Sequence, residues 1–137
     1  TGFHSDENGL FLYDYQIKGL LKEAGNVLKD VLGVKALRSK IDNYVFVQPR
    51  RIYLGKEEPD GVLERPLRAQ TAQGVRVALA RSDDVDAGTT CVCEVILLKG
   101  PITPAHIGAI LGYGALKGLG QFRNGGFGRF TAKIQPA

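Results

Sequence analysis

The pattern that most constrains the fold is a run of apolar residues spaced three or four apart between residues 17 and 31. The members of this run are Ile17, Leu20, Leu21, Ala24, Leu28 and Val31. That spacing places apolar side chains on one face of an α-helix, and such a face needs another element to cover it. We predict that the carboxylate of Asp14 caps the start of this helix and that Gly33 ends it.

Shorter patterns lie on both sides of this helix. Residues 10–13 (LFLY) predict a short strand or an extended lead-in. Residues 34–42 predict a second helix, with Val34, Leu37 and Ile41 on one side.

The middle of the chain has the composition of β-strands. Residues 45–54 are strand-like but contain Pro49, which predicts an edge strand or a break. Residues 89–98 (TTCVCEVILL) are apolar at nearly every position. We therefore expect residues 89–98 to form a central strand that is covered on both faces.

Two turn signals predict a β-hairpin excursion over residues 52–82. Pro59-Asp60-Gly61 is the first signal and Gln73-Gly74 is the second, and strand-like residues 62–70 and 75–82 flank the second. The hairpin is expected as an insertion in one domain that spans residues 1–137.

A third helix is predicted to begin after Thr103 and to run to about Lys117. Pro104 fits its first position, where the missing N–H costs nothing, and Ile102 and Ile107 have the spacing of a hydrophobic staple. The expected buried residues are Ile107, Ile110 and Leu111. Residues 127–134 are then expected to form a final strand. The order of helix, strands, helix and strand predicts an α+β fold.

The composition is typical of a soluble globular domain. Hydrophobic residues make up 44% of the 137 residues and charged residues 23%. No apolar run approaches the roughly 20 residues that span a bilayer, so we expect a cytoplasmic protein without membrane contacts. The chain has no methionine and begins with Thr1, so we expect a processed product or a piece of a longer chain.

The two cysteines, Cys91 and Cys93, stand two residues apart. On a strand they would share a face, which is poor geometry for a disulfide between them. We read them as small apolar residues of a reducing compartment. No cluster of metal ligands accompanies them, so neither a metal site nor another cofactor is expected.

Positive charge is concentrated in the last third of the chain. After Glu94 there is no acid, while five bases follow: Lys99, Lys117, Arg123, Arg129 and Lys133. A local positive potential of this kind suits an anionic partner.

The glycine-rich stretch GLGQFRNGGFGRF, residues 118–130, lies within this basic part. It is neither a phosphate-binding loop nor a dinucleotide fingerprint, because no Gly-Lys-Ser/Thr is present and the glycines follow a helix. Arginine forks bind phosphate, glycines admit a sugar–phosphate chain, phenylalanine rings stack on bases, and amides reach base edges or 2′-hydroxyls. The residues expected to contact single-stranded RNA are Lys117, Gly118, Gly120, Gln121, Phe122, Arg123, Asn124, Gly125, Gly126, Phe127, Gly128 and Arg129.

Two alternatives remain open for this stretch. Phe127 and Phe130 also suit the core side of a final strand, and the glycines also suit a simple bend. Four bases outside it, Lys18, Lys22, Arg50 and Arg51, are candidates to extend a basic track or are merely solvated.

The stretch resembles the signature loop of the RAMP superfamily of CRISPR-associated proteins, in which a helix leads into G-x-G…R-x-G-G-[FY]-G-R. Here it reads from Gly118 to Arg129. Residues 17–22, IKGLLK, are similar to the L-K-G-x-[LF]-R stretch of the backbone subunits of that superfamily, with Lys22 in place of arginine. The chain also resembles small phage-encoded proteins that have the same loop.

The resemblance implies a ferredoxin-like (RRM-like) β-α-β-β-α-β domain that holds RNA by its backbone. The first strand of such a domain would be residues 10–13 or would lie upstream of Thr1. The implied function is a non-catalytic RNA-binding module, either a CRISPR effector component in a multi-subunit complex or a phage-encoded relative.

Two further functions are kept as alternatives. A phage protein can dock onto or mimic a host complex through protein contacts, in an anti-defence role. Some relatives cleave RNA without a metal by means of a histidine, so His4 and His106 are the catalytic candidates. Neither has a partner at a fixed spacing that would orient its imidazole, so we expect a binder rather than an enzyme.

Overall fold

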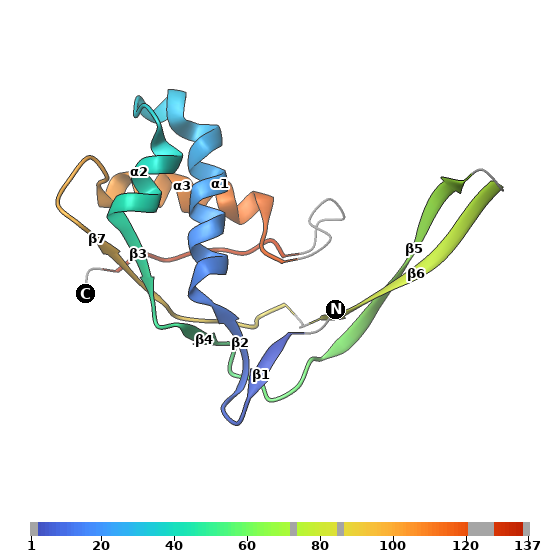
Figure 1. Cartoon of the computed structure of the whole chain (residues 1–137). Helices are drawn as coiled ribbons and strands as arrows, with labels where there is room; N and C mark the ends of the chain where they lie inside the picture. The colour runs from blue at the N-terminus through green and yellow to red at the C-terminus, as the bar shows by residue number, and fades with distance from the viewer. Residues whose placement is uncertain (1–2, 72–73, 85–86, 121–127, 136–137) are drawn as a thin grey trace. The chain divides into compact units, whose positions relative to one another are not determined.

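A computed structural model describes most of the chain (Figure 1). The described backbone comprises residues 3–71, 74–84, 87–120 and 128–135, and side chains are described outside residues 63–86. Within these residues the fold is α+β, with three helices and small antiparallel sheets.

The chain divides into two compact units. Unit 1 comprises residues 1–12 and 53–92, and unit 2 comprises residues 13–52 and 93–137. The chain therefore passes from one unit to the other three times.

Unit 1 consists of β-structure. Its strands are β1 (His4–Asp6), the greater part of β2 (Gly9–Tyr13), the end of β4 (Arg51–Tyr53), β5 (Gly61–Thr71) and β6 (Gly74–Asp84). β1 pairs antiparallel with β2, and one sheet has the strand order β1-β2-β4. The Leu10 N–H donates to the Lys56 carbonyl oxygen at 2.7 Å, which closes the segment after β4 onto β2.

The predicted hairpin is β5 and β6, in register from Gly61 opposite Asp84 to Thr71 opposite Gly74. It begins later and ends later than the predicted residues 52–82, since β4 is a separate short strand. The predicted turn signal at residues 59–61 directly precedes β5. The other predicted turn, at residues 73–74, includes Gln73, which lies outside the described residues.

Unit 2 places three helices against a two-stranded sheet. Its elements are α1 (Asp14–Leu32), α2 (Leu37–Tyr44), β3 (Val45–Gln48), β7 (Glu94–Leu97) and α3 (Pro104–Lys117). The core residues with no exposed surface are Leu21, Ala24, Leu37, Ile41, Val45, Ile52 and Ile110. Each leucine, isoleucine or valine among them contributes about 2 kcal/mol of hydrophobic stabilisation, and Ala24 contributes less.

Two glycines allow the helices of unit 2 to approach one another. A Cβ on Gly25 of α1 would lie 2.5 Å from Ile41 Cδ1 of α2, and a Cβ on Gly114 of α3 would lie 3.3 Å from Leu20 Cδ1 of α1. The apolar stripe of α1 is therefore covered by both neighbouring helices.

The helix ends differ slightly from the predictions. Tyr13, not Asp14, is the cap of α1, and the Gln16 side-chain oxygen accepts from the Tyr13 N–H at 2.8 Å. Asp14 is the first helical residue, and its carboxylate accepts from the Tyr15 N–H. Gly33 ends α1 at φ 68°, as predicted.

The second and third helices also follow the predictions in outline. α2 begins and ends later than residues 34–42, with Leu37 and Ile41 buried. The Thr103 hydroxyl accepts from the His106 N–H at 3.3 Å, which confirms the predicted cap of α3.

Four residues of the predicted apolar faces lie outside the core. Val31, in the last turn of α1, is 81% exposed, and Leu28, Val34 and Leu111 are half-buried. Val34 lies before α2 rather than within it.

Two strand predictions are wrong. Residues 89–98 do not form a covered central strand: β7 spans Glu94–Leu97, pairs with β3, and Val92 before it is 87% exposed. The described part of residues 127–134 forms no strand, because the Phe130 N–H donates to the Ala115 carbonyl of α3 at 3.2 Å. Backbone bonds to a helix end have replaced the expected strand pairing.

Candidate nucleic-acid interface

The predicted loop is described at its two ends. Lys117, Gly118 and Gly120 precede the gap in the description, and Gly128 and Arg129 follow it. The predicted contacts that lie outside the described residues are Gln121, Phe122, Arg123, Asn124, Gly125, Gly126 and Phe127.

The two ends of the loop are held together at the end of α3. The Gly118 N–H donates to the Gly114 carbonyl at 2.8 Å, and the Leu119 N–H donates to the Gly128 carbonyl at 2.9 Å. We call residues 117–120 and 128–130 the loop base. These two bonds hold Leu119 and Gly128 together next to the last turn of α3.

Gly128 has a structural reason to be glycine. Its φ is 82°, and a Cβ there would collide with the Leu119 carbonyl oxygen. Gly120 also has a positive φ of 83°, but no atom lies within 4 Å of a Cβ built on it. The bend itself therefore requires glycine at 128, without any ligand.

The two cations of the loop base have different surroundings. Lys117 Nζ lies 3.8 Å from Glu23 Oε1 of α1, with both side chains more than a third exposed. Arg129 is exposed, and its side chain makes no hydrogen bond or ion pair with another described residue. Its guanidinium is therefore available to an anion.

A second group of cations lies along α1. Tyr15, Lys18 and Lys22 are spaced by three and four residues, so they share one face of the helix. The segment from β3 to β4 places Phe46 and Arg50 next to residues of this face. We call the following residues the cation–ring strip: Tyr13, Tyr15, Lys18, Lys22, Phe46 and Arg50.

The two lysines of the strip converge on Asp42 of α2. Lys18 Nζ donates to the Asp42 carbonyl oxygen at 2.9 Å, and Lys22 Nζ donates to Asp42 Oδ1 at 3.1 Å. The hydrogen bond and charge of Lys22 lower the pKa of the Asp42 carboxyl. Lys18 Nζ also lies 4.7 Å from the centroid of the Phe46 ring.

Arg50 joins the strip through one acid and two rings. Its Nη1 donates to Asp14 Oδ1 at 3.0 Å, and its Cζ lies 5.0 Å from the Tyr13 ring centroid and 5.5 Å from that of Tyr15. The two rings stack on each other at 5.1 Å, with 17° between their planes. Arg51, the remaining predicted base of the track, lies exposed on β4.

Sequence reasoning missed the three rings of the strip. Tyr13, Tyr15 and Phe46 each lie within reach of a cation that the sequence did single out. The spacing of Tyr15 and Lys18 was the one available signal, because residues three apart in a helix are neighbours. The approach of Arg50 and Phe46 required the tertiary structure.

The two histidine candidates have separate surroundings. His106 Nδ1 accepts from the Thr103 N–H at 3.1 Å, so this ring nitrogen takes part in the cap of α3. The His4 ring stacks on Phe11, with 5.8 Å between their centroids. His4 thus lies in β1 of unit 1, and His106 lies in α3 of unit 2.

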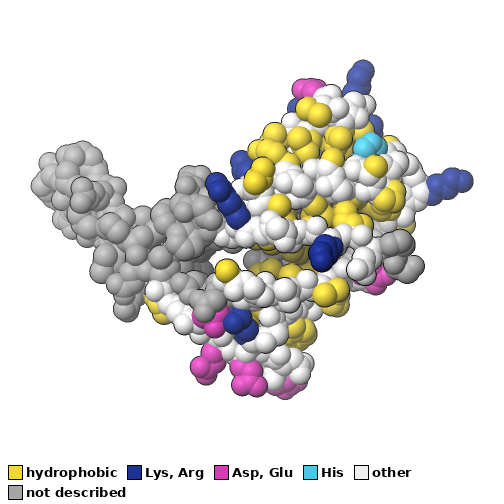
Figure 2. All heavy atoms as spheres, turned by 180° about the vertical axis from the view of Figure 1, so that it is seen from behind, with side chains coloured by type: hydrophobic (Ala, Val, Ile, Leu, Met, Phe, Trp, Pro, Cys, Tyr) yellow, Lys and Arg dark blue, Asp and Glu magenta, His cyan; other side chains and the backbone are white. Residues whose placement is uncertain are grey.

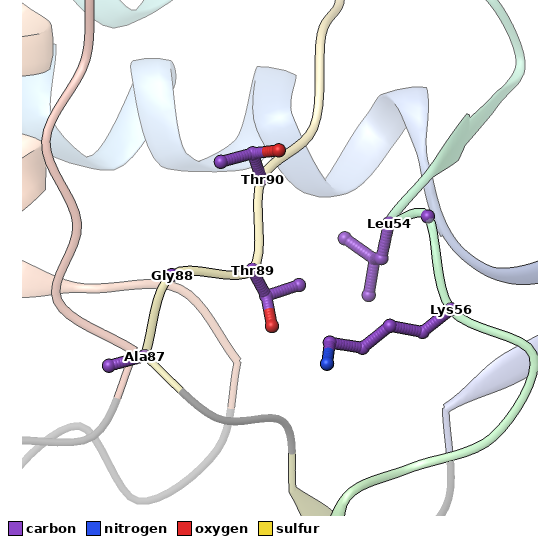
Figure 3. Close-up of a pocket in the computed structure, with 7 residues that line it drawn as sticks. Leu54, Lys56, Ala87, Gly88, Thr89 and Thr90 are labelled. Atoms are coloured by element: carbon purple, nitrogen blue, oxygen red, sulfur yellow. The ribbon is translucent and has the colours of Figure 1, made fainter.

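A hollow of about 490 Å³ lies among the described residues of unit 1 (Figure 3). Its lining residues are Leu54, Gly55, Lys56, Ala87, Gly88, Thr89 and Thr90. Lys56 Nζ extends into it, but the same ammonium is 2.9 Å from Asp60 Oδ2. That ion pair offsets the charge that would attract an anion.

Unit 1 also carries acids that oppose an anionic ligand. Asp6, Glu7, Glu57 and Glu58 belong to its β1–β2 turn and to the segment after β4. Figure 2 shows acidic side chains gathered on one part of the surface, and apolar side chains exposed elsewhere. Among the residues whose side chains the structure describes, the candidate contacts therefore lie in unit 2.

Among the described residues, no three His, Cys, Asp or Glu side chains are placed to hold a metal ion, and no helix is long and apolar enough to cross a membrane. No family model, curated protein or solved structure matches the chain.

Proposed function

We propose that this chain is a non-catalytic module that binds single-stranded RNA through unit 2. The observation that carries the proposal is Arg129, an exposed arginine without a partner among the described residues, at the base of a glycine-rich loop. Phosphate oxygens match the planar guanidinium fork, and such contacts supply most of the affinity of non-specific nucleic-acid binding.

The order of elements along the chain supports a relation to ferredoxin-like RNA-binding domains. After β2 the chain forms α1, then the antiparallel pair β3 and β7, and then α3. This is the order of the first five elements of a β-α-β-β-α-β domain, with α2 and the excursion of unit 1 added. A CRISPR effector component or a phage-encoded relative is the proposed setting, on the resemblance of residues 118–129.

The test is a titration of a fluorescently labelled single-stranded RNA at several salt concentrations. Binding should weaken linearly on logarithmic axes as salt rises, because counterions are released from the RNA. Arg129→Ala should weaken binding to all sequences alike and lower the salt slope by about one.

Lys35→Ala is the matched control, since Lys35 is exposed and lies in the turn after α1. This variant should bind as the parent does. Salt-independent binding, or equal losses in the two variants, would contradict the proposal. Retention of a host protein after ribonuclease treatment, without RNA affinity, would favour a docking role instead.

A further inference from the structure

The need for positive charge does not explain why the cation–ring strip contains two stacked tyrosines. An RNA backbone needs cations, and Lys18, Lys22 and Arg50 supply them. The stacked rings of Tyr13 and Tyr15 add a flat aromatic surface at the start of α1. Tyr15 is 53% exposed, although its ring already contacts a neighbouring ring and a guanidinium.

The ring pair is fixed by contacts on several sides. The Tyr13 N–H is bound by the Gln16 side chain, and the Asp14 N–H donates to the Arg50 carbonyl at 3.0 Å. The guanidinium of Arg50 lies over both rings and donates to Asp14 Oδ1. Because these contacts order the two rings before a ligand binds, stacking of a ligand on them costs little conformational entropy of the protein.

Arg50 retains donors beyond the one that Asp14 accepts. A guanidinium has five N–H groups, and the side chain of Arg50 is 68% exposed. A ligand that stacks on Tyr15 can therefore place an anionic group against the remaining donors. A flat ring joined to a phosphate by a short linker has this chemistry, and an unpaired nucleotide is such a group.

We infer that Tyr15 and Arg50 form a nucleotide platform, in which Tyr15 stacks on one unpaired base and Arg50 binds the adjacent phosphate. Lys18 and Lys22 continue the cationic face along α1 toward the next phosphates. The inference rests on the proposed RNA-binding function and assigns it a second contact, separate from the loop base.

The chain contains no tryptophan, so Tyr15→Trp introduces a single indole at the platform. Val31→Trp is the matched control, because Val31 is 81% exposed on the same helix about 24 Å away along its axis. The probes are a twelve-nucleotide oligoadenylate RNA and an inorganic polyphosphate of similar charge. The RNA should quench the emission of the Tyr15→Trp indole, whereas the polyphosphate should bind without quenching it.

The second part of the test measures RNA affinity in variants that contain no tryptophan. Tyr15→Ala should weaken RNA binding roughly tenfold, and Tyr15→Phe should retain it, because stacking needs the ring and not the hydroxyl. Polyphosphate binding should be the same in both. Thermal melts by circular dichroism show that each variant is folded.

The outcomes separate the inference from the function on which it rests. If the parent binds RNA but Tyr15→Ala binds equally well, or both indoles respond alike, the platform is wrong and the RNA-binding function stands. If the parent binds no RNA, both fail. Quenching by a proline-rich peptide and not by RNA would assign the rings to a protein partner and overturn the inference.

Discussion

The loop base and the cation–ring strip both present cations on unit 2, but they hold them in opposite ways. In the strip, Lys18, Lys22 and Arg50 each contact an acid or a carbonyl, and Lys18 and Arg50 also contact rings. In the loop base, Arg129 contacts no acid within the described residues, and backbone bonds alone hold its surroundings. The cations of the strip are thus tied to the fold by side-chain contacts, whereas in the loop base Lys117 lies 3.8 Å from Glu23 Oε1 and no described acid contacts Arg129.

The largest expected effect concerns the backbone of the loop base. Gly128→Ala forces a Cβ against the Leu119 carbonyl in a left-handed conformation and should lower the free energy of unfolding by about 3 kcal/mol. Gly120→Ala meets no atom and should cost about 1 kcal/mol, for its positive φ alone. Urea denaturation measures both. Equal losses would show that Leu119 and Gly128 do not hold the loop base together.

An intermediate effect on the free energy of unfolding distinguishes Arg50, which contacts an acid and two rings, from Arg129, which contacts no described acid. Arg50→Ala removes an ion pair and two ring contacts and should lower the free energy of unfolding by about 0.5–1 kcal/mol, since its exposed position screens the charge. Arg129→Ala should change it by less than about 0.5 kcal/mol. Thermal melts of the two variants provide the measurement. A larger loss for Arg129→Ala would reverse the comparison.

The smallest effect is a pH dependence at Asp42. Because Lys22 lowers the pKa of Asp42 in the folded chain below its ordinary value of 3.8, the charged form stabilises the fold. This stabilisation is present above the ordinary pKa and is lost as the pH falls through the lowered one. The parent should therefore exceed Asp42→Asn in stability near neutral pH, and the difference should disappear in acid. A difference that is constant with pH, or unchanged by high salt, would contradict the role of the charge.

Much of the helical framework could be predicted because its signals are local. The stripe from Ile17 to Ala24, the stop at Gly33 and the cap at Thr103 depend on residues within a few positions of one another. The β5–β6 hairpin is of the same kind, since it pairs residues that are close in sequence, beginning with Thr71 opposite Gly74.

The strand at residues 89–98 shows why the rest could not be predicted. Its apolar run indicated that these residues would be buried. It did not indicate which strands would pair with them or which elements would cover them. β3 offers four residues of pairing to β7, from Val45 to Gln48, so the other residues of the run remain unpaired with it. The same limit applies to Phe130. Its backbone N–H donates to the Ala115 carbonyl of α3 rather than to a neighbouring strand.

The sequence by itself determined three helices with their end signals, a β-hairpin, and a basic segment without acids after Glu94. The tertiary structure decided which cations are held by acids and which ring pair meets Arg50, because those partners are 20 to 36 residues apart in the chain. Local patterns report the conformational preference of a segment. Which side chains meet follows from the packing of α1 against β3 and the loop before β4, and that packing depends on the whole core.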